Sequence, residues 1–383
     1  MENIIVGAGL TGSYIASQLA EKGEKVRIIE KRSHIAGNLY DKIDKETGTL
    51  YHVYGPHIFH TDEQWVWDFV NKYATFIPFL LKNRIYFKNI KRFVDFPFNY
   101  KTINYFYNKE NAKKLIDLFE KKYPNQLRVN IPEMLNSDEP LIKEFAEILW
   151  ENDYKLYTAK QWGIPVDTVD PSVLKRVPFF LYEQEFTFTD KYQGLPKGGY
   201  TKFIENMLNH SNITIELNKN ALDYLEIKDN KVFYEGKQVR LFFSGAIDEL
   251  FNYKFGDLGY RSLSFEFSKQ PHNHTEIGDP CVTVFPEEKY PFTRVANYGQ
   301  LPIQNDLAFD LIGYEYSSKF SKNDNQTDRF YPISTVEDKE IYAKYLEEAN
   351  KIEGLKMVGR LGQYKYYDMD KALIAARNIL EEV

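Results

Sequence analysis

The pattern that most constrains the fold lies at the start of the chain, where a short apolar run is followed by three closely spaced glycines. Gly7, Gly9 and Gly12 have G-x-G-x-x-G spacing, and the residues after them have the apolar periodicity of a helix. A second apolar run, Lys25–Ile29, predicts a strand that ends at Glu30. Strand, glycine turn, helix and strand in this order are typical of the Rossmann-like unit that binds a dinucleotide.

Each part of this unit has a defined task. The glycines allow a tight turn and let a pyrophosphate approach the main chain, while the helix N-terminus presents unpaired N–H groups to that anion. Glu30 stands 18 residues after Gly12, where a carboxylate accepts hydrogen bonds from a ribose diol. A glycine triplet alone is a weak signal, but its context and the acidic residue favour a cofactor site over a purely structural turn.

The residues after the second strand favour a flavin over a nicotinamide. Lys31 and Arg32 follow the acidic residue, and Gly37 and Asn38 come shortly after them. This order resembles the FAD-binding variant of the unit, in which the loop follows the flavin diphosphate. NAD(P)-binding domains commonly continue directly into another strand–helix pair. We therefore predict FAD as the cofactor.

The composition argues against several classes of partner. A net charge of -6 and the lack of a long basic run argue against nucleic acid and anionic membranes. No apolar run approaches the roughly 20 residues that a bilayer requires, and no signal peptide is recognisable, so we expect a cytoplasmic protein without membrane insertion. The lone Cys281 rules out an internal disulfide and fits a reducing compartment, where we expect a buried structural thiol. Aromatic residues make up 16% of the chain, which fits either ligand stacking or a compositional bias.

Further segments predict insertions between parts of the flavin domain, giving an α/β fold with a Rossmann-like FAD-binding domain. We assign residues 1–80, 190–250 and 340–383 to that domain. Helical periodicity predicts a helical insertion with a substrate lid at 101–175, and β-rich runs predict an antiparallel sheet domain at 255–335.

A loop with three histidines, His52, His57 and His60, follows the opening unit. No Asp, Glu or Cys completes a metal-ligand set with them in the sequence, so we expect no metal and interpret the segment as a flavin-facing loop.

Eight motifs resemble those of bacterial UDP-galactopyranose mutases in order and spacing, from about residue 3 to residue 380. They are "YGPHIFHT", "YTAKQWG", "LKRVPF", "DKYQGLPKGGYTKFIENML", "SGAIDELFNYKFG", "YRSL", "PFTRV" and "GRLGQYKYYDM". The resemblance implies an isomerase of polysaccharide biosynthesis that interconverts UDP-galactopyranose and UDP-galactofuranose without net oxidation. It implies attack of reduced flavin N5 on the anomeric carbon, an external electron donor such as NAD(P)H, and a homodimer.

The resemblance also implies roles for individual residues. Arg176 and Arg294 match arginines that bind the diphosphate and shield its charge, and Tyr316 and Tyr366 match tyrosines that contact it. Tyr157 matches a uracil-stacking residue. Trp162 matches a residue of the lid near the substrate. The residues implied as catalytic are Arg176, Arg294, His57 and Asp368.

For the cofactor, the resemblance adds residues far from the glycine turn. Arg360 matches a residue that contacts FAD, and His57 and His60 match the histidine loop beside the flavin. Asp368 and the following Met369 complete the predicted cofactor site. This assignment gives a task to the dense C-terminal stretch "GRLGQYKYYDM", in which hydroxyl-bearing rings stand beside a guanidinium and a carboxylate.

Several positions depart from the family pattern, namely Leu81, Ala159, Thr187, Ala296 and Gln363. Leu81 occupies the position of an asparagine that faces the sugar, and Thr187 that of a tyrosine that contacts the nucleotide. An apolar residue at position 81 would leave a sugar hydroxymethyl group without a partner, which costs about 1–3 kcal/mol. This favours, as an alternative, a sugar that lacks the C6 hydroxyl, as in UDP-arabinopyranose or dTDP-fucopyranose.

Two further classes of function stay open from the sequence. A conventional FAD oxidoreductase, such as a relative of the amine oxidases, shares the dinucleotide-binding unit but would oxidise its substrate. A nucleotide-sugar binder without turnover is compatible with the departures from the family pattern, although both arginines are retained.

Overall fold

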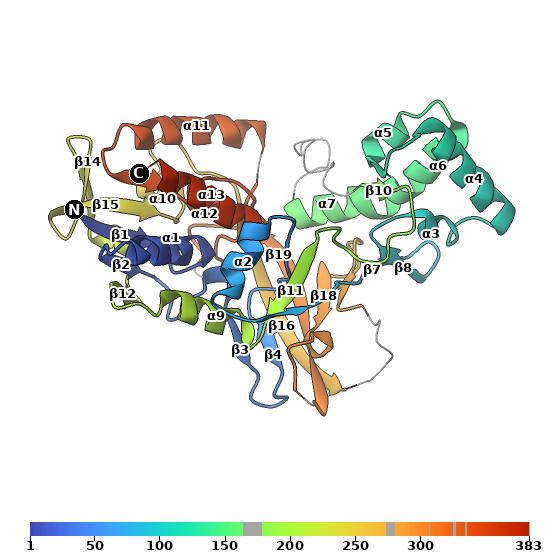
Figure 1. Cartoon of the computed structure of the whole chain (residues 1–383). Helices are drawn as coiled ribbons and strands as arrows, with labels where there is room; N and C mark the ends of the chain where they lie inside the picture. The colour runs from blue at the N-terminus through green and yellow to red at the C-terminus, as the bar shows by residue number, and fades with distance from the viewer. Residues whose placement is uncertain (164–177, 273–279, 306, 325–326, 334, 383) are drawn as a thin grey trace. The chain divides into compact units, whose positions relative to one another are not determined.

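The fold is seen in a computed structural model that describes residues 1–163, 178–272, 280–305, 307–324, 327–333 and 335–382. The chain divides into two compact units, each assembled from separate stretches of sequence (Figure 1). Unit 1 consists of Met1–Phe79, Asp190–Leu263 and Lys319–Val383, and unit 2 of Leu80–Thr189 and Ser264–Ser318.

Unit 1 is built on a seven-stranded sheet whose central strands are parallel. Strand β1 (Glu2–Val6) pairs in parallel with β2 (Val26–Ile29) on one side and with β15 (Lys237–Phe243) on the other. The outer strands are β12 (Ile213–Glu216) beside β2, β21 (Leu355–Met357) beside β15, and the antiparallel strands β14 (Lys231–Tyr234) and β13 (Leu225–Lys228). This mixed sheet confirms the predicted Rossmann-like fold.

Helix α1 (Leu10–Glu21) follows the glycine turn and packs against α9 (Gly199–Leu208) and α13 (Met369–Glu381). Its buried side chains include Ile15 and Leu19, which lie on one face of the helix. The other helical segments of unit 1 are η1 (Gly37–Leu39), α2 (Gln64–Asn71), η4 (Ala221–Asp223), α10 (Ile247–Leu250), α11 (Val336–Asn350) and α12 (Gly359–Gly362). The helix that packs on the first strand thus comes into contact with the last helix of the chain.

Two small sheets complete unit 1 and contain the histidine loop. One has the order β5-β11-β6, and the other pairs β3 with β4. Their bounds are β3 (Asp41–Ile43), β4 (Leu50–His52), β5 (Phe59–Thr61), β6 (Phe76–Pro78) and β11 (Tyr192–Pro196). His52 therefore ends one strand, and His60 lies in the middle of another.

Unit 2 contains a mostly antiparallel sheet of the order β16-β19-β18-β17-β7-β8. Strands β17 and β7 pair in parallel, whereas β18 pairs antiparallel with β17 and β19. The bounds are β7 (Asn83–Phe87), β8 (Arg92–Phe96), β16 (Tyr260–Pro271), β17 (Val282–Val284), β18 (Arg294–Asn297) and β19 (Phe309–Lys319). The start of β16 belongs to unit 1, where it pairs with β20 (Tyr331–Pro332).

The helical part of unit 2 surrounds an aromatic core. Phe119, Phe145 and Phe179 are fully buried, and the rings of Phe119 and Phe179 stack with centroids 5.1 Å apart. Its elements are α3 (Tyr100–Ile103), α4 (Lys109–Lys122), β9 (Arg128–Val129), α5 (Ile131–Leu135), α6 (Pro140–Leu149), the π-helical turn η2 (Trp150–Tyr154), α7 (Lys155–Trp162) and β10 (Phe179–Phe180). Part of the high aromatic content is therefore core packing.

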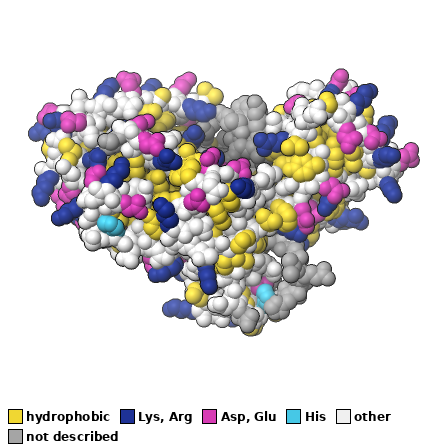
Figure 2. All heavy atoms as spheres, in the orientation of Figure 1, with side chains coloured by type: hydrophobic (Ala, Val, Ile, Leu, Met, Phe, Trp, Pro, Cys, Tyr) yellow, Lys and Arg dark blue, Asp and Glu magenta, His cyan; other side chains and the backbone are white. Residues whose placement is uncertain are grey.

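The surface has no single-sign region on the face shown in Figure 2, where Lys and Arg are interspersed with Asp and Glu over both units. Within the described ranges, no helix is long and apolar enough to cross a membrane. Cys281 is buried beside β17, and burial raises the pKa of its thiol to about 12, as expected for a structural cysteine.

Candidate active site

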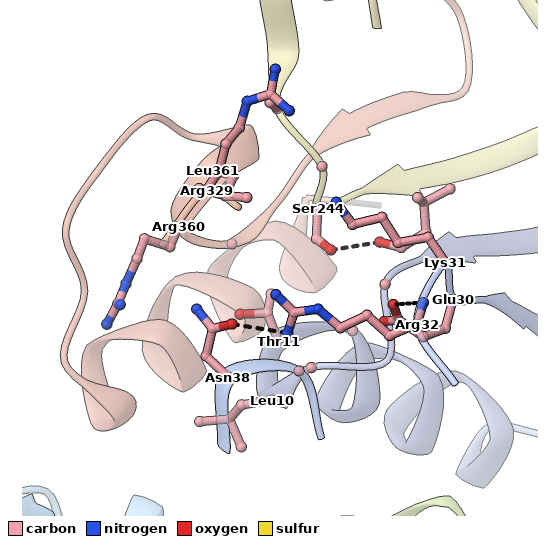
Figure 3. Close-up of a pocket in the computed structure, with 18 of the residues that line it drawn as sticks. Leu10, Thr11, Glu30, Lys31, Arg32, Asn38, Ser244, Arg329, Arg360 and Leu361 are labelled. Carbon is pink, nitrogen blue, oxygen red and sulfur yellow. Dashed lines mark hydrogen bonds between the residues drawn. The ribbon is translucent and has the colours of Figure 1, made fainter. Parts of the chain in front are cut away.

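A cavity of about 400 Å³ lies in unit 1 where the central strands end (Figure 3). Val6, Ile29 and Phe243, the last residues of β1, β2 and β15, line it. Ligands of open α/β sheets bind at this carboxyl edge, and the volume suits a cofactor. The predicted cofactor residues that line the cavity are Gly7, Gly9, Gly12, Glu30, Lys31, Arg32, Gly37, Asn38, His57, Arg360 and Met369.

The glycine turn has the geometry of a pyrophosphate cradle. Gly7 has a φ of +99°, and a Cβ atom on Gly12 would lie 2.1 Å from the Gly7 carbonyl oxygen. Gly9 is the N-cap of α1, and no side chain caps this helix terminus. The first N–H groups of the helix are therefore available to an anion, and the missing side chains leave room for it to approach. The residues present fit a dinucleotide.

Glu30 is held in place by main-chain donors. Its carboxylate accepts hydrogen bonds from the N–H groups of Ala8, at 2.9 Å, and Arg32, at 2.8 Å. The side chain is only 5% exposed, yet it lines the cavity. A carboxylate oxygen accepts more than one hydrogen bond, so this geometry orients Glu30 without using up its capacity to bind a ribose hydroxyl.

Arg32 lines the cavity, and its guanidinium contacts three other side chains. Its Nη1 donates to Asn38 Oδ1 at 3.0 Å, and its Nη2 donates to Asp328 Oδ2 at 2.6 Å. Its guanidinium also lies over the ring of Tyr54, 4.7 Å from the centroid, and His34 Nε2 lies 2.9 Å from the Tyr54 hydroxyl oxygen. Figure 3 shows the Arg32 side chain reaching toward Asn38, near Thr11 in the first turn of α1.

The tyrosines of the C-terminal stretch divide between core and cavity. The Tyr364 hydroxyl lies within hydrogen-bonding distance of the Gly259 and Ile333 carbonyl oxygens, and burial raises its pKa. Tyr367 lines the cavity, and its carbonyl accepts a hydrogen bond from Arg360 Nη2 at 2.6 Å. The third, Tyr366, is 38% exposed and lies under the Arg360 guanidinium.

The histidine loop reaches the cavity through His57 alone. The main-chain N–H of His57 donates to His52 Nδ1 at 3.0 Å, and burial lowers the pKa of His52 to about 3, which keeps that ring neutral. His60 is paired with Asp190 Oδ2 at 3.1 Å, and it is not among the residues that line the cavity. Across the described ranges, no three His, Cys, Asp or Glu residues form a group that could hold a metal ion.

Asp368 also lies outside the cavity lining, although Met369 beside it belongs to it. An N-cap residue stands directly before the first residue of a helix. The structure places Asp368 at that position before α13, but its side chain makes no capping hydrogen bond.

In unit 2, Arg294, which is predicted to bind the diphosphate, forms an ion pair with the buried carboxylate of Glu315. Its Nε donates to Glu315 Oε1 at 3.0 Å, and its Nη2 is paired with Glu315 Oε2. The Thr293 hydroxyl donates to the same Glu315 Oε1 at 3.1 Å. Glu315 is 2% exposed, whereas 29% of the Arg294 side chain is exposed. This bidentate pair holds an accessible guanidinium in one orientation.

The other substrate positions of unit 2 lie on separate elements. The Tyr316 hydroxyl donates to Glu266 Oε2 at 2.8 Å, which raises the pKa of Tyr316. Tyr157 lies on α7, and Trp162 is the last residue of that helix. Leu81 is 5% exposed, and its carbonyl accepts a hydrogen bond from the Thr187 N–H at 2.8 Å. Arg176 falls outside the described residues.

Several cavity residues were not predicted from the sequence. Ser244 directly follows β15, and its hydroxyl donates to the Val6 carbonyl at 2.6 Å, next to the turn. A small residue directly after a buried apolar strand, as Ser244 is after β15, could have indicated a cavity residue in the sequence. Lys219 and Asp328 carried no local signal, because they reach the cavity only through the tertiary fold. The unpredicted lining residues include Thr11, Lys219, Ser244, Asp328, Arg329 and Tyr367.

Comparisons with known proteins identify the family of the chain. A family model described as UDP-galactopyranose mutase matches residues 153–366, and one described as NAD(P)-binding Rossmann-like domain matches residues 5–73. The dTDP-fucopyranose mutase of Escherichia coli is 36% identical over 96% of this chain and 94% of its own length. The UDP-galactopyranose mutase of Mycoplasma genitalium is 35% identical over 97% of this chain and 92% of its own.

A solved structure extends the similarity to the fold. The crystal structure of a reduced UDP-galactopyranose mutase aligns with a TM-score of 0.73, covering 100% of this chain and 94% of that chain at 17% identity. At this level of identity the alignment supports the architecture, and the sequence comparisons support the enzyme class.

Proposed function

Because the chain belongs to the UDP-galactopyranose mutase family and is a nucleotide-sugar pyranose mutase, we propose that it binds FAD in the cavity of unit 1. With that flavin reduced, it interconverts pyranose and furanose forms of the sugar without net oxidation. The observation that carries the FAD proposal is the uncapped N-terminus of α1, which meets the cavity at the glycine turn beside Glu30.

Residues of unit 1 bind and orient the cofactor in this proposal. The N–H groups at the start of α1 bind the pyrophosphate, and Glu30 accepts hydrogen bonds from the ribose. Arg32 and Arg360 line the same cavity and supply positive charge beside the phosphates. When bound and reduced, the flavin supplies N5 as the nucleophile toward the anomeric carbon of the sugar. We further propose that NAD(P)H or a similar donor reduces it.

Residues of unit 2 hold the nucleotide that must leave the anomeric carbon and return to it. We propose that Arg294, oriented by Glu315, binds the diphosphate together with Arg176 and stabilises the charge that develops as the C–O bond breaks. Tyr316 adds a hydroxyl donor, Tyr157 stacks on the base, and Trp162 contributes to the lid that excludes water. We propose Tyr366, a residue of unit 1, as a further hydroxyl donor to the diphosphate. His57 and Asp368 complete the proposed catalytic set.

For the sugar, UDP-galactopyranose is our first candidate because the family model and the Mycoplasma enzyme are both named for it. A sugar without the C6 hydroxyl is the second candidate. Leu81 is a buried apolar residue at a position matched to the sugar, and the relative at 36% identity is a dTDP-fucopyranose mutase. The two relatives have nearly the same identity to this chain, so identity does not choose between their substrates.

One experiment tests the whole proposal. The purified protein is reduced with dithionite and incubated separately with UDP-galactopyranose, UDP-arabinopyranose and dTDP-fucopyranose, and the products are resolved by chromatography. We expect conversion of at least one sugar nucleotide to its furanose form and, after cyanoborohydride treatment, a sugar–flavin adduct detected by mass spectrometry.

Two outcomes separate the proposal from the other classes. In air and without dithionite, stoichiometric consumption of oxygen with formation of an oxidised product would identify a conventional FAD oxidoreductase. Flavin binding without conversion of any of the three sugars would identify a nucleotide-sugar binder. We also propose a homodimer in the cytoplasm, which sedimentation and cell fractionation test independently.

A further inference from the structure

Lys160 on α7 forms a contact that no role assigned so far explains. Its Nζ donates hydrogen bonds to three main-chain carbonyl oxygens, those of Phe285 at 2.7 Å, Glu287 at 2.8 Å and Phe292 at 2.8 Å. All three carbonyls belong to the loop between β17 and β18. An ammonium group has three N–H donors, so each of them has an acceptor in this loop. We call Lys160 and these three carbonyls the Lys160 clamp.

The loop held by the clamp leads directly into the diphosphate arginine. The loop is closed by a hydrogen bond from the Phe285 N–H to the Thr293 carbonyl at 2.9 Å, and the Thr293 N–H donates to the Glu315 carbonyl at 2.7 Å. The next residue is Arg294, whose guanidinium Glu315 clasps. The positions of Lys160 and Arg294 are therefore joined through a short, fully hydrogen-bonded path.

The same helix is attached to the neighbouring strand at a second point. The Ser317 hydroxyl donates to the Gln161 carbonyl at 2.9 Å, one residue after Tyr316 on β19. Helix α7 also carries Tyr157, one turn before Lys160. The helix proposed to bind the base is thus hydrogen-bonded to β19 and to the loop that leads into β18, which carry the proposed diphosphate residues.

The clamp depends on a proton. Burial lowers the pKa of Lys160 to about 8, an effect that the carboxylates of Glu287 and Glu288 oppose. Lys88 lies 3.7 Å from Glu287 and is the other charged group paired there. A neutral amine has only two N–H donors, so one carbonyl loses its partner when Lys160 is deprotonated. An apolar residue of similar length at position 160 would pack against the loop but could not donate hydrogen bonds to its three carbonyl oxygens.

We propose that Lys160 is a positioning residue that fixes the distance between the base-binding face of α7 and Arg294, so that a nucleoside diphosphate contacts both at once. This inference rests on the function proposed above. A ligand that uses only one of the two elements gains nothing from the clamp, whereas a ligand that spans them is bound by a preorganised site.

The test compares Lys160→Met with Lys155→Met in the FAD-loaded protein. Lys155 lies on the same helix, is exposed and pairs only locally with Glu151, so it is a matched control. Calorimetry measures the binding of UDP, dTDP and uridine. We expect Lys160→Met to weaken binding of the preferred diphosphate by roughly tenfold while uridine binding changes by less than about twofold, and Lys155→Met to change neither.

A pH series provides a readout that general destabilisation does not produce. Between pH 7 and 9.5, diphosphate affinity of the unaltered protein should fall with a midpoint near pH 8, where Lys160 loses its proton. The Lys160→Met variant should lack this alkaline decrease. If Lys160→Met unfolds or loses FAD, the pH series of the unaltered protein and of Ser317→Ala, which should retain the decrease, decides the question.

The outcomes distinguish this inference from the proposed function. If the unaltered protein binds a nucleoside diphosphate but Lys160→Met behaves like Lys155→Met, or if no alkaline decrease is seen, the clamp has no positioning role and the proposed function stands. If the unaltered protein binds neither UDP nor dTDP, both the proposed function and the inference are wrong.

Discussion

The two units bind their proposed ligands by different chemical means. The cavity of unit 1 is shaped around missing side chains and main-chain donors, with Gly7, Gly9 and Gly12 at its centre. The substrate positions of unit 2 are charged or aromatic side chains held by other groups, as Glu315 holds Arg294. A site made of main chain tolerates few substitutions, whereas a site made of side chains is altered by single changes. Under the proposed function, single substitutions in unit 2 can therefore change the sugar while the cofactor site of unit 1 is kept.

The largest expected effect follows from a side chain in the glycine turn. In Gly12→Val, the Cβ would lie 2.1 Å from the Gly7 carbonyl oxygen, so the turn cannot form. We expect bound flavin, measured by its visible absorbance, to fall by roughly tenfold or more, because the pyrophosphate loses the N–H groups of α1.

Gly9→Val separates folding of the turn from binding of the cofactor. A Cβ at position 9 meets only Gly37 Cα, at 3.7 Å, so the protein itself accommodates it. We expect a folded, colourless protein whose thermal melting matches that of the apoprotein. A yellow Gly9→Val protein would contradict the proposed pyrophosphate position.

The next effect falls on unit 2 and should spare the flavin. Arg294→Ala removes the guanidinium that Glu315 orients, and we expect turnover to fall roughly 100- to 1,000-fold with FAD content unchanged. Because Glu315 is left buried and unpaired, unfolding free energy should also fall by about 3 kcal/mol.

The double variant Arg294→Ala/Glu315→Gln separates the loss of turnover from the loss of unfolding free energy. Replacing the carboxylate by a neutral amide removes the uncompensated charge, so stability in urea unfolding should recover while turnover stays low. Recovery of turnover together with stability would show that Arg294 acts only through the fold.

A smaller effect tests how easily unit 2 changes its sugar. In Leu81→Asn, an amide replaces the apolar group, and the ratio of kcat/KM for UDP-galactopyranose over a sugar without the C6 hydroxyl should rise by about 10-fold. Leu80→Asn is the matched control: Leu80 precedes Leu81 in the chain, but its side chain is 47% exposed, so an amide there is in contact with solvent. An equal change in both variants, or none in Leu81→Asn, would remove position 81 from the substrate site.

The smallest expected effect on FAD binding comes from Tyr54, which contacts the lining residue Arg32. Tyr54→Phe removes the hydroxyl that meets His34 but keeps the ring under Arg32. We expect the Kd for FAD, from fluorescence titration of apoprotein, to rise by less than about threefold, since a single hydrogen bond contributes about 1 kcal/mol. Tyr54→Ala, which removes the ring as well, should have the larger effect, and the reverse order would contradict the stacking interpretation.

The sequence predicted the parts of the site that depend on local pattern. The glycine spacing, the acidic end of β2 and the periodicity of α1 lie within 30 residues of one another, so they define the Rossmann-like unit and the cavity wall that it forms. The opposite wall was not predictable in this way. Ser244 lies next to the glycine turn because β15 pairs with β1. Asp328 lines the cavity where it is paired with Arg32.

The same limit applies to unit 2 and to the C-terminal tyrosines. Glu315 orients Arg294 because β18 and β19 pair in the register that places these residues opposite each other, and their separation in sequence gives no sign of it. Within "GRLGQYKYYDM", Tyr364 is a buried core residue while Tyr367 lines the cavity. Composition shows that rings are abundant, but only tertiary packing assigns each ring to the core or to a ligand.

The assembly of unit 1 from three stretches has a consequence for how the enzyme matures. The cavity includes residues from Val6 to Ala372, and β1 is flanked by β15, which in turn needs β21 near the end of the chain. A ribosome-bound nascent chain therefore exposes the glycine turn long before the opposite wall has been synthesised. The proposed cofactor site can therefore be complete only after the residues up to Ala372 have been synthesised.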